Sequence, residues 1–262
     1  MTDRRFAIDE NSIDVWLAFY HEIEDVRLLA SLRELLNEEE RCREPRFHFA
    51  DDRKRYLVTR ALVRTVLSRY AEVAPKDWTF SSNDYGRPRI AEVHDVARGL
   101  SFNVSHTRGL IALGVTRGRE LGVDVEHTTI REVSSGIAER FFAPCEVDAL
   151  ATVPPQRRQD RFFEYWTFKE SYIKARGMGL SIPLDRFGFH FPHERSVGLA
   201  IEPELGDDAS RWAFWQYRPA PHYLLAICAE RRAAQAPRVV LRRTVPTVFD
   251  ELLALPVLRA SP

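Results

Sequence analysis

The sequence predicts an α+β protein with two similar subdomains, each a long helix packed on a small antiparallel sheet, arranged as a pseudo-twofold duplication. Two observations favour this fold class. Residues 51–70 and 156–176 each show helical spacing, and each is followed by short alternating segments broken by turn residues. The order of a helix and then antiparallel strands therefore occurs twice. Any α+β chain can be divided in this way, so the order alone leaves a single mixed domain open.

The first half contains an amphipathic helix at 51–70, where apolar Leu57, Ala61, Val63 and Leu67 recur between Arg and Lys residues. Short segments of alternating polarity follow it and favour antiparallel strands. We expect these strands at 85–90, 100–107 and 109–115, with turns at 107–109 and 116–120.

The second half repeats the pattern. Short helices are expected within 139–150, and a strong helix at 156–176 is stopped by the glycines at 177 and 179 and by Pro183. Strands are expected at 185–191, 211–217 and 222–228, the last two joined by the turn 218–222. We therefore expect subdomains at 1–118 and 119–232, and a tail at 233–262 that packs on the body or stays mobile.

Composition limits the class of protein. Hydrophobic residues make up 45% of the chain, and Lys plus Arg equals Asp plus Glu at 38 each, so bulk positive charge does not favour a nucleic-acid partner. A local basic pocket remains open. The cysteines Cys42, Cys145 and Cys228 are odd in number and far apart, which is typical of reduced thiols. The first ten residues contain no apolar signal region, and the apolar run 223–229 is too short to cross a membrane. We expect a soluble cytoplasmic protein.

The stretch GVDVEH at 122–127 places Asp124 and Glu126 two residues apart. In a strand, residues at this spacing point to the same side, with Val123 and Val125 on the other. Two like charges on one face repel, so a cation is expected opposite them.

A second acid lies within an aromatic arc of the helix at 156–176. On a helical wheel Glu170 falls between Trp166 and Phe163, and Lys174 follows one turn later. Burying an acid among aromatic rings is costly unless a cation compensates. An ordinary surface ion pair between Glu170 and Lys174 is the alternative.

Asp124, Glu126 and Glu170 together can supply a site for a hard cation. Mg²⁺ takes few protein oxygens and completes its octahedron with water and substrate phosphate, so a phosphate-bearing substrate is expected. Ser105 and His106 lie near a strand end, where a hydroxyl, an imidazole and backbone N–H groups can converge on an anion. A structural role for each remains open.

These motifs carry a resemblance. FNVSHT (102–107), GVDVE (122–126) and WTFKESYIKA (166–175), in this order, resemble the three signature motifs of the 4′-phosphopantetheinyl transferases, and in particular the larger, pseudo-dimeric surfactin-synthetase-activating (Sfp) type. The pattern W-x-x-K-E-S-x-x-K is complete at Trp166, Lys169, Glu170, Ser171 and Lys174. The resemblance covers about residues 40–230.

The resemblance implies a holo-[acyl-carrier-protein] synthase. Such an enzyme transfers the phosphopantetheine arm of coenzyme A to a serine of an apo acyl, peptidyl or aryl carrier protein and releases adenosine 3′,5′-bisphosphate. It implies that Mg²⁺, or Mn²⁺, is held by Asp124, Glu126 and Glu170. Lys174 would contact the phosphates, and Glu170, or a water that it orients, would take the serine proton.

The resemblance also implies contacts to the nucleotide end of coenzyme A. Ser105 and His106 would bind there, with His106 at the 3′-phosphate. Gly86 and Arg87 match the turn near the adenine and its phosphates, with Arg in place of the usual Lys. Arg55 matches a 3′-phosphate contact, and Arg43 is a weaker match for a further one.

Two alternatives stay open. A non-catalytic coenzyme A or nucleotide-binding module would share the fold, and a metal-dependent phosphohydrolase would share the carboxylates. The chain has no GxGxxG, GxxxxGK[ST], HExxH or GxSxG motif, which removes the main support for other common enzyme classes. Because a duplicated fold can build a site from both halves of one chain, we expect a monomer.

Overall fold

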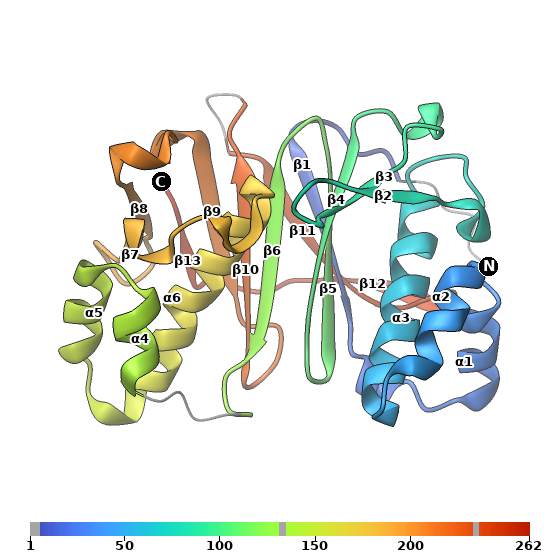
Figure 1. The fold of residues 1–262 in the computed structure, drawn as a ribbon, viewed down its shortest axis with the longest axis horizontal. Coiled ribbons are helices and arrows are strands. Elements are labelled where there is room, and N and C mark those ends of the chain that lie inside the picture. The colour runs from blue at the N-terminus through green and yellow to red at the C-terminus, as the bar shows by residue number, and fades with distance from the viewer. Residues whose placement is uncertain (1–5, 131–134, 233–235) are drawn as a thin grey trace. The chain divides into compact units, whose positions relative to one another are not determined.

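The computed structural model describes residues 6–130, 135–232 and 236–262, which form two compact units. Unit 1 comprises Met1–Asn83, Pro88–Gly118 and Pro237–Ala254. Unit 2 comprises Asp84–Arg87, Arg119–Ala236 and Leu255–Pro262. Both units combine helices with sheets, which confirms the mixed class that the sequence predicts (Figure 1).

Unit 1 contains a five-stranded sheet in the order β12-β11-β1-β5-β4 and a two-stranded sheet of β2 and β3. Its helices are α1 (Val26–Arg33), α2 (Glu38–Arg43) and α3 (Ala50–Leu67). Its strands are β1 (Ser12–Ala18), β2 (Phe80–Ser82), β3 (Pro88–Ile90), β4 (Leu100–Thr107), β5 (Leu110–Arg117), β11 (Arg238–Val245) and β12 (Phe249–Leu253). Short 3-10 helices lie at Tyr20–Glu22, Glu44–Arg46, Pro75–Asp77 and Asp95–Ala97.

Helix α3 forms where the sequence predicts it and buries its apolar face in the core of unit 1. The same helix buries a charge, because the Arg64 side chain is fully buried. Arg64 Nη2 and Nε lie 2.8 and 2.9 Å from Glu40 Oε2, and Nη1 donates to backbone carbonyl groups that include Trp78 O at 2.9 Å. The ion pair therefore attaches α2 to α3 and fixes the segment that follows them.

Within the tail that we expected at 233–262, the described residues 236–262 contribute strands to both units. β11 pairs in parallel with β1 and antiparallel with β12, so residues 237–254 belong to the sheet of unit 1. Residues 255–262 belong to unit 2, where β13 (Arg259–Ala260) pairs with β9. The physical reason lies in β1, whose seven residues are all buried and which therefore needs a paired strand on both edges.

Unit 2 contains a four-stranded sheet in the order β13-β9-β10-β6 and a two-stranded sheet of β7 and β8. Its helices are α4 (Ser135–Phe141), α5 (Pro144–Ala151) and α6 (Pro155–Arg176). Its remaining strands are β6 (Leu121–His127), β7 (Phe187–His190), β8 (Gly198–Ile201), β9 (Trp212–Tyr217) and β10 (Tyr223–Glu230). Short 3-10 helices lie at Gly179–Ser181, Leu184–Arg186, Pro203–Leu205 and Ala209–Arg211.

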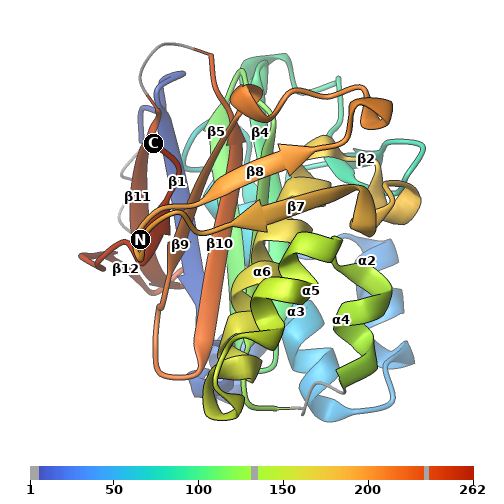
Figure 2. The ribbon, with the colours of Figure 1, turned by 90° about the vertical axis from the view of Figure 1, so that its left-hand side faces the viewer.

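Helix α6 packs along β6 and β10 (Figure 1), and β7 packs on α5 and α6 (Figure 2). Helix α6 begins with a proline in its first turn and is capped by Gly177, whose φ of 67° is the left-handed conformation that favours glycine. Within it, the fully buried Lys169 ammonium lies 2.7 Å from Glu146 Oε2 and donates to Leu184 O and Phe187 O. This pair holds α5, α6 and β7 together directly beside Glu170. No helix in the described ranges is long and apolar enough to cross a membrane.

Candidate active site

The face of β6 that carries Asp124 and Glu126 is turned toward α6. Gly122 lies on this face, and a Cβ atom there would collide with the Ser171 carbonyl oxygen and the Ala175 nitrogen of α6. Val123 and Val125, on the opposite face, are buried. Glycine at 122 thus lets strand and helix approach closely enough for side chains farther along β6 to meet α6.

Helix α6 brings Lys174 onto Asp124. The Lys174 ammonium donates to Asp124 Oδ1 at 2.6 Å, and the side chains are 26% and 5% exposed. Glu170 lies one helical turn before Lys174 and is close enough to Asp124 for the two charges to interact. Asp124, Glu170 and Lys174 therefore meet between β6 and α6, and the bond between Asp124 and Lys174 was not expected.

Burial and a neighbouring charge perturb the Glu170 carboxyl. Burial, and next the charge of Asp124, raise the pKa of the Glu170 carboxyl, while the Lys174 ammonium opposes the shift. Ionised Glu170 is therefore disfavoured, and a cation that binds here would favour it. A carboxylate with a raised pKa is also a stronger base.

The carboxylates fit a hard cation in donor type, because Mg²⁺ binds oxygen ligands. Among the residues that the structure describes, however, no three His, Cys, Asp or Glu side chains are grouped closely enough to hold a metal ion. Asp124 and Glu170 interact, while Glu126 is half-buried two residues farther along the same face of β6. Carboxylate oxygens that could bind a metal ion are therefore present, and the Lys174 ammonium forms an ion pair with one of them, Asp124 Oδ1.

The candidates from unit 1 lie on β4 and α3. In β4, Ser105 is paired with Ala112 and His106 with Ile111 of β5. Neighbouring residues of a strand point to opposite faces, and Ser105 is buried whereas His106 is exposed. The sequence predicts that the hydroxyl and the imidazole converge on one anion. In the structure they lie on opposite sides of the sheet. On α3, Arg55 Nη2 lies 2.7 Å from Asp52 Oδ1.

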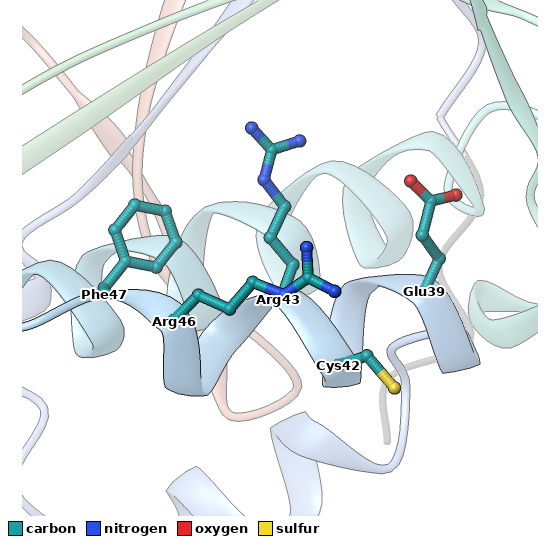
Figure 3. Close-up of a pocket in the computed structure, with 5 residues that line it drawn as sticks. All are labelled: Glu39, Cys42, Arg43, Arg46 and Phe47. Atoms are coloured by element: carbon teal, nitrogen blue, oxygen red, sulfur yellow. The ribbon is translucent and has the colours of Figure 1, made fainter.

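Unit 1 also contains a cavity of about 380 Å³ at the end of α2. It is lined by Glu39, Cys42, Arg43, Arg46 and Phe47 (Figure 3). Both arginines are exposed, and Figure 3 shows Arg43 and Phe47 projecting to the same side of the segment. Arg46 and Phe47 were not predicted, although two arginines three residues apart on a helical turn are a signal for a shared cationic face.

The turn that carries Gly86 and Arg87 groups with unit 2. Gly86 has a φ of 82°, a conformation that disfavours other residues. The Arg87 guanidinium donates to Glu120 Oε2 at 2.7 Å, to Ala175 O at 3.0 Å and to Leu121 O at 2.9 Å. The side chain expected at the nucleotide phosphates thus makes bonds to β6, α6 and the residue before β6.

Comparison with known proteins adds independent information. Residues 120–228 match the 4′-phosphopantetheinyl transferase superfamily, and residues 25–116 match the N-terminal region of 4′-phosphopantetheinyl transferases.

Named relatives agree with these matches. The 4′-phosphopantetheinyl transferase Sfp of Bacillus subtilis strain 168 is 35% identical over 72% of this chain and 79% of its own length. The transferase ffp of Bacillus subtilis is 34% identical over 73% of this chain and 80% of its own. HetI of a Nostoc species is 34% identical over 58% of this chain and 64% of its own. The chain therefore belongs to the 4′-phosphopantetheinyl transferase superfamily.

Proposed function

We propose that this protein transfers the 4′-phosphopantetheine group of coenzyme A to a serine of an apo carrier protein and releases adenosine 3′,5′-bisphosphate. The observation that carries the proposal is the Asp124–Lys174 ion pair beside Glu170, on two elements inside the region that matches the superfamily. Relatives that cover most of this chain are named for the same transfer.

We propose that Asp124, Glu126 and Glu170 hold a Mg²⁺ or Mn²⁺ ion. When bound, the metal would polarise the phosphoryl oxygens and neutralise part of their charge. Asp124 is buried and Glu170 has a raised pKa, so both carboxylates gain from a nearby cation. Lys174 would then leave Asp124, because a metal ion and an ammonium compete for the same carboxylate oxygen.

The side chains of this chain would do three things during transfer. The Lys174 ammonium, released from Asp124, would stabilise the negative charge that develops on the departing phosphate. Glu170 would take the proton of the carrier serine, directly or through a water, and burial raises its pKa toward the value that this role needs. The nucleophile belongs to the carrier protein, so catalysis by this chain rests on positioning and on charge stabilisation.

We propose that unit 1 contributes contacts to the nucleotide end. His106 is exposed and can reach an anion, and Arg55 and Arg43 are cationic groups on α3 and α2. Arg43 lines the cavity with Arg46 and Phe47, a combination that suits a phosphate and a flat ring. We further propose that Ser105 and the backbone at Gly86 lie near the nucleotide.

The test is a transfer assay. The protein is incubated with coenzyme A, Mg²⁺ and an apo carrier protein, and the carrier is weighed by mass spectrometry. We expect the mass of one phosphopantetheine arm on the carrier, and none on a carrier in which the acceptor serine is replaced by alanine. Coenzyme A binding without transfer would indicate a binding module, and phosphate release without transfer would indicate a phosphohydrolase.

We also propose that the two units are copies of one ancestral unit. In unit 1, β1 is followed by α1, α2, α3 and the pairs β2–β3 and β4–β5; in unit 2, β6 is followed by α4, α5, α6 and the pairs β7–β8 and β9–β10. The sheet orders β1-β5-β4 and β6-β10-β9 correspond in the same way. These correspondences support the pseudo-twofold duplication that the sequence predicts.

The remaining expectations are proposals of the same kind. We propose a monomer that works in the cytoplasm, where reduced thiols such as Cys42, Cys145 and Cys228 are the rule. Gel filtration beside the transfer assay tests the monomer. The chemistry of the site does not distinguish acyl, peptidyl and aryl carriers, so the assay includes one of each.

A further inference from the structure

Arg87 joins the two elements that carry the candidate catalytic groups. Its side chain is only 9% exposed, and one guanidinium group donates to three acceptors on two segments that lie far apart in the sequence. Leu121 is the first residue of β6, Glu120 precedes it, and Ala175 is in the last turn of α6. The backbone carbonyls in the last turn of a helix lack a helical partner, so Arg87 also supplies a donor that α6 needs.

These bonds lie where β6 and α6 come closest. Gly122, next to Leu121, is the residue at which a Cβ atom would collide with Ser171 and Ala175. Lys174 adjoins Ala175, and Asp124 follows Leu121 by three residues, so the Arg87 bonds and the Asp124–Lys174 bond share one stretch of strand and helix. Any slide of β6 along α6 would stretch both sets of bonds.

We propose that Arg87 is a positioning residue that fixes β6 against α6 and thereby places Asp124 relative to Glu170 and Lys174. The proposal rests on the transfer activity proposed above. The planar guanidinium is needed because its nitrogens reach a strand carbonyl, a helix carbonyl and a carboxylate at the same time. The single ammonium of a lysine would keep the charge but could not span the three acceptors.

The decisive variant is Arg87→Lys, because a contact to phosphate and a role in positioning predict different results. If Arg87 positions β6 and α6, kcat should fall about tenfold or more, since misplacement of about 1 Å can cost as much as 10²-fold. The KM for coenzyme A and its Kd by calorimetry should change less than about threefold. The kcat is normalised to the fraction of protein that binds coenzyme A, so a loss of folded protein cannot imitate the effect.

Two further variants and a control sharpen the test. Glu120→Ala removes one acceptor of Arg87, and should lower kcat in the same direction by less. Arg87→Lys combined with Lys174→Ala should lose less than the product of the single losses, because both changes act on one arrangement. Arg89→Lys is the control, since Arg89 is exposed on β3 and should keep the kcat of the natural protein.

Other results would overturn the inference. A raised KM and Kd for coenzyme A with normal kcat in Arg87→Lys would place Arg87 on the nucleotide instead. Fully multiplicative losses with Lys174→Ala would show that Arg87 acts independently of the cluster. If Arg87→Lys does not fold, Glu120→Ala alone decides, and an unchanged kcat there would reject the positioning role. No transfer by the natural protein would reject the proposed function itself, and coenzyme A binding would still be measurable.

Discussion

Unit 1 and unit 2 each bury an aspartate in their first strand, and the two aspartates have different partners. Asp14 in β1 accepts a bond from the Tyr70 hydroxyl at 2.5 Å, and that hydroxyl accepts one from Trp16 Nε1 at 2.9 Å. Tyr70 and Trp16 are buried as well. In β6, Asp124 is paired with Lys174, whose side chain is 26% exposed.

The exposure of the partner separates a structural carboxylate from one that can act in chemistry. Asp14 lies in a network in which burial raises the pKa of Asp14 and of the Tyr70 hydroxyl, and its other partner, Arg242 at 4.0 Å, has a side chain that is only 15% exposed. Lys174 can leave Asp124 through the solvent-exposed side of α6, so Asp124 can exchange an ammonium for another cation. We therefore expect changes around Asp14 to affect stability, and changes around Asp124 to affect turnover.

The largest effect should come from removing divalent metal. We expect EDTA to abolish carrier modification and Mg²⁺ or Mn²⁺ to restore it, because the carboxylates around Asp124 repel phosphate without a cation. The measurement is the initial rate of carrier modification against free metal concentration. Full turnover in metal-free buffer would mean that Lys174 alone neutralises the site, and would reject the metal assignment.

Much of the fold could be predicted because it is local. The apolar spacing of α3 and α6 and the alternation in β4 and β6 follow from neighbouring residues. β1 was not predicted, because its alternation of polarity covers only residues 12–15 and an apolar run follows. β11 pairs with Ser12–Leu17 across more than two hundred residues, and no local pattern specifies such a partner.

The candidate site likewise has a part that follows from local sequence and a part that depends on contacts between distant residues. The shared face of Asp124 and Glu126 and the single turn between Glu170 and Lys174 follow from backbone periodicity. The bonds of Arg87 depend on carbonyl groups at 121 and 175 that meet only after folding, so a side chain expected at phosphate is found in a tertiary contact. The opposite orientations of Ser105 and His106 follow from alternation alone and could have been predicted.

Removal of the residues after Arg232 should reduce carrier modification almost as much as removal of the metal does. The loss should come from unfolding of unit 1. Without β11, the fully buried β1 becomes an open edge, and the sheet loses β12 as well. We expect the truncated protein to be insoluble or to lack a cooperative thermal transition. Soluble truncated protein that still modifies the carrier would show that β11 and β12 are dispensable.

Glu170→Gln should reduce kcat by about 10²-fold or more, the range for losing acid–base or charge stabilisation. Glutamine nearly keeps the shape, and without Mg²⁺ it relieves a buried acid of its repulsion with Asp124, so Tm should hold or rise. Near-normal kcat with a clearly lowered Tm would instead indicate a simple ion pair with Lys174.

The pH dependence gives the sign of the Glu170 effect. The folded pKa of Glu170 is raised, so its ionisation above the ordinary pKa of a glutamate destabilises the metal-free fold. Below that ordinary pKa the natural protein and Glu170→Gln should have equal Tm. The Tm of the natural protein should fall below that of Glu170→Gln as the pH rises through the raised pKa. A difference in Tm between the two proteins that shrinks with rising pH would contradict a raised pKa of Glu170.

Tyr70→Phe tests the structural side of the comparison. The change removes the donor to Asp14 and the acceptor for Trp16, and should cost about 1–3 kcal/mol of unfolding free energy. The kcat per folded molecule should not change. Val93→Ala is the stability control, because Val93 is 76% exposed and should lose less than about 0.5 kcal/mol. A loss of kcat in Tyr70→Phe at normal stability would remove the distinction between the two aspartates.

The smallest effect should come from His106→Ala. His106 is exposed on β4, so its loss should leave Tm unchanged, and the 3′-phosphate is remote from the bond that reacts, so kcat should also hold. Losing a charge-assisted hydrogen bond of about 1.5–3 kcal/mol should raise the KM for coenzyme A about tenfold or more. The penalty should disappear with 3′-dephospho-coenzyme A, because that substrate lacks the phosphate that the imidazole would contact. An equal rise in KM with both substrates would place His106 elsewhere on the nucleotide. An unchanged KM would remove His106 from the site. Unit 1 would then have Arg43, Arg46 and Arg55 as its candidate phosphate ligands.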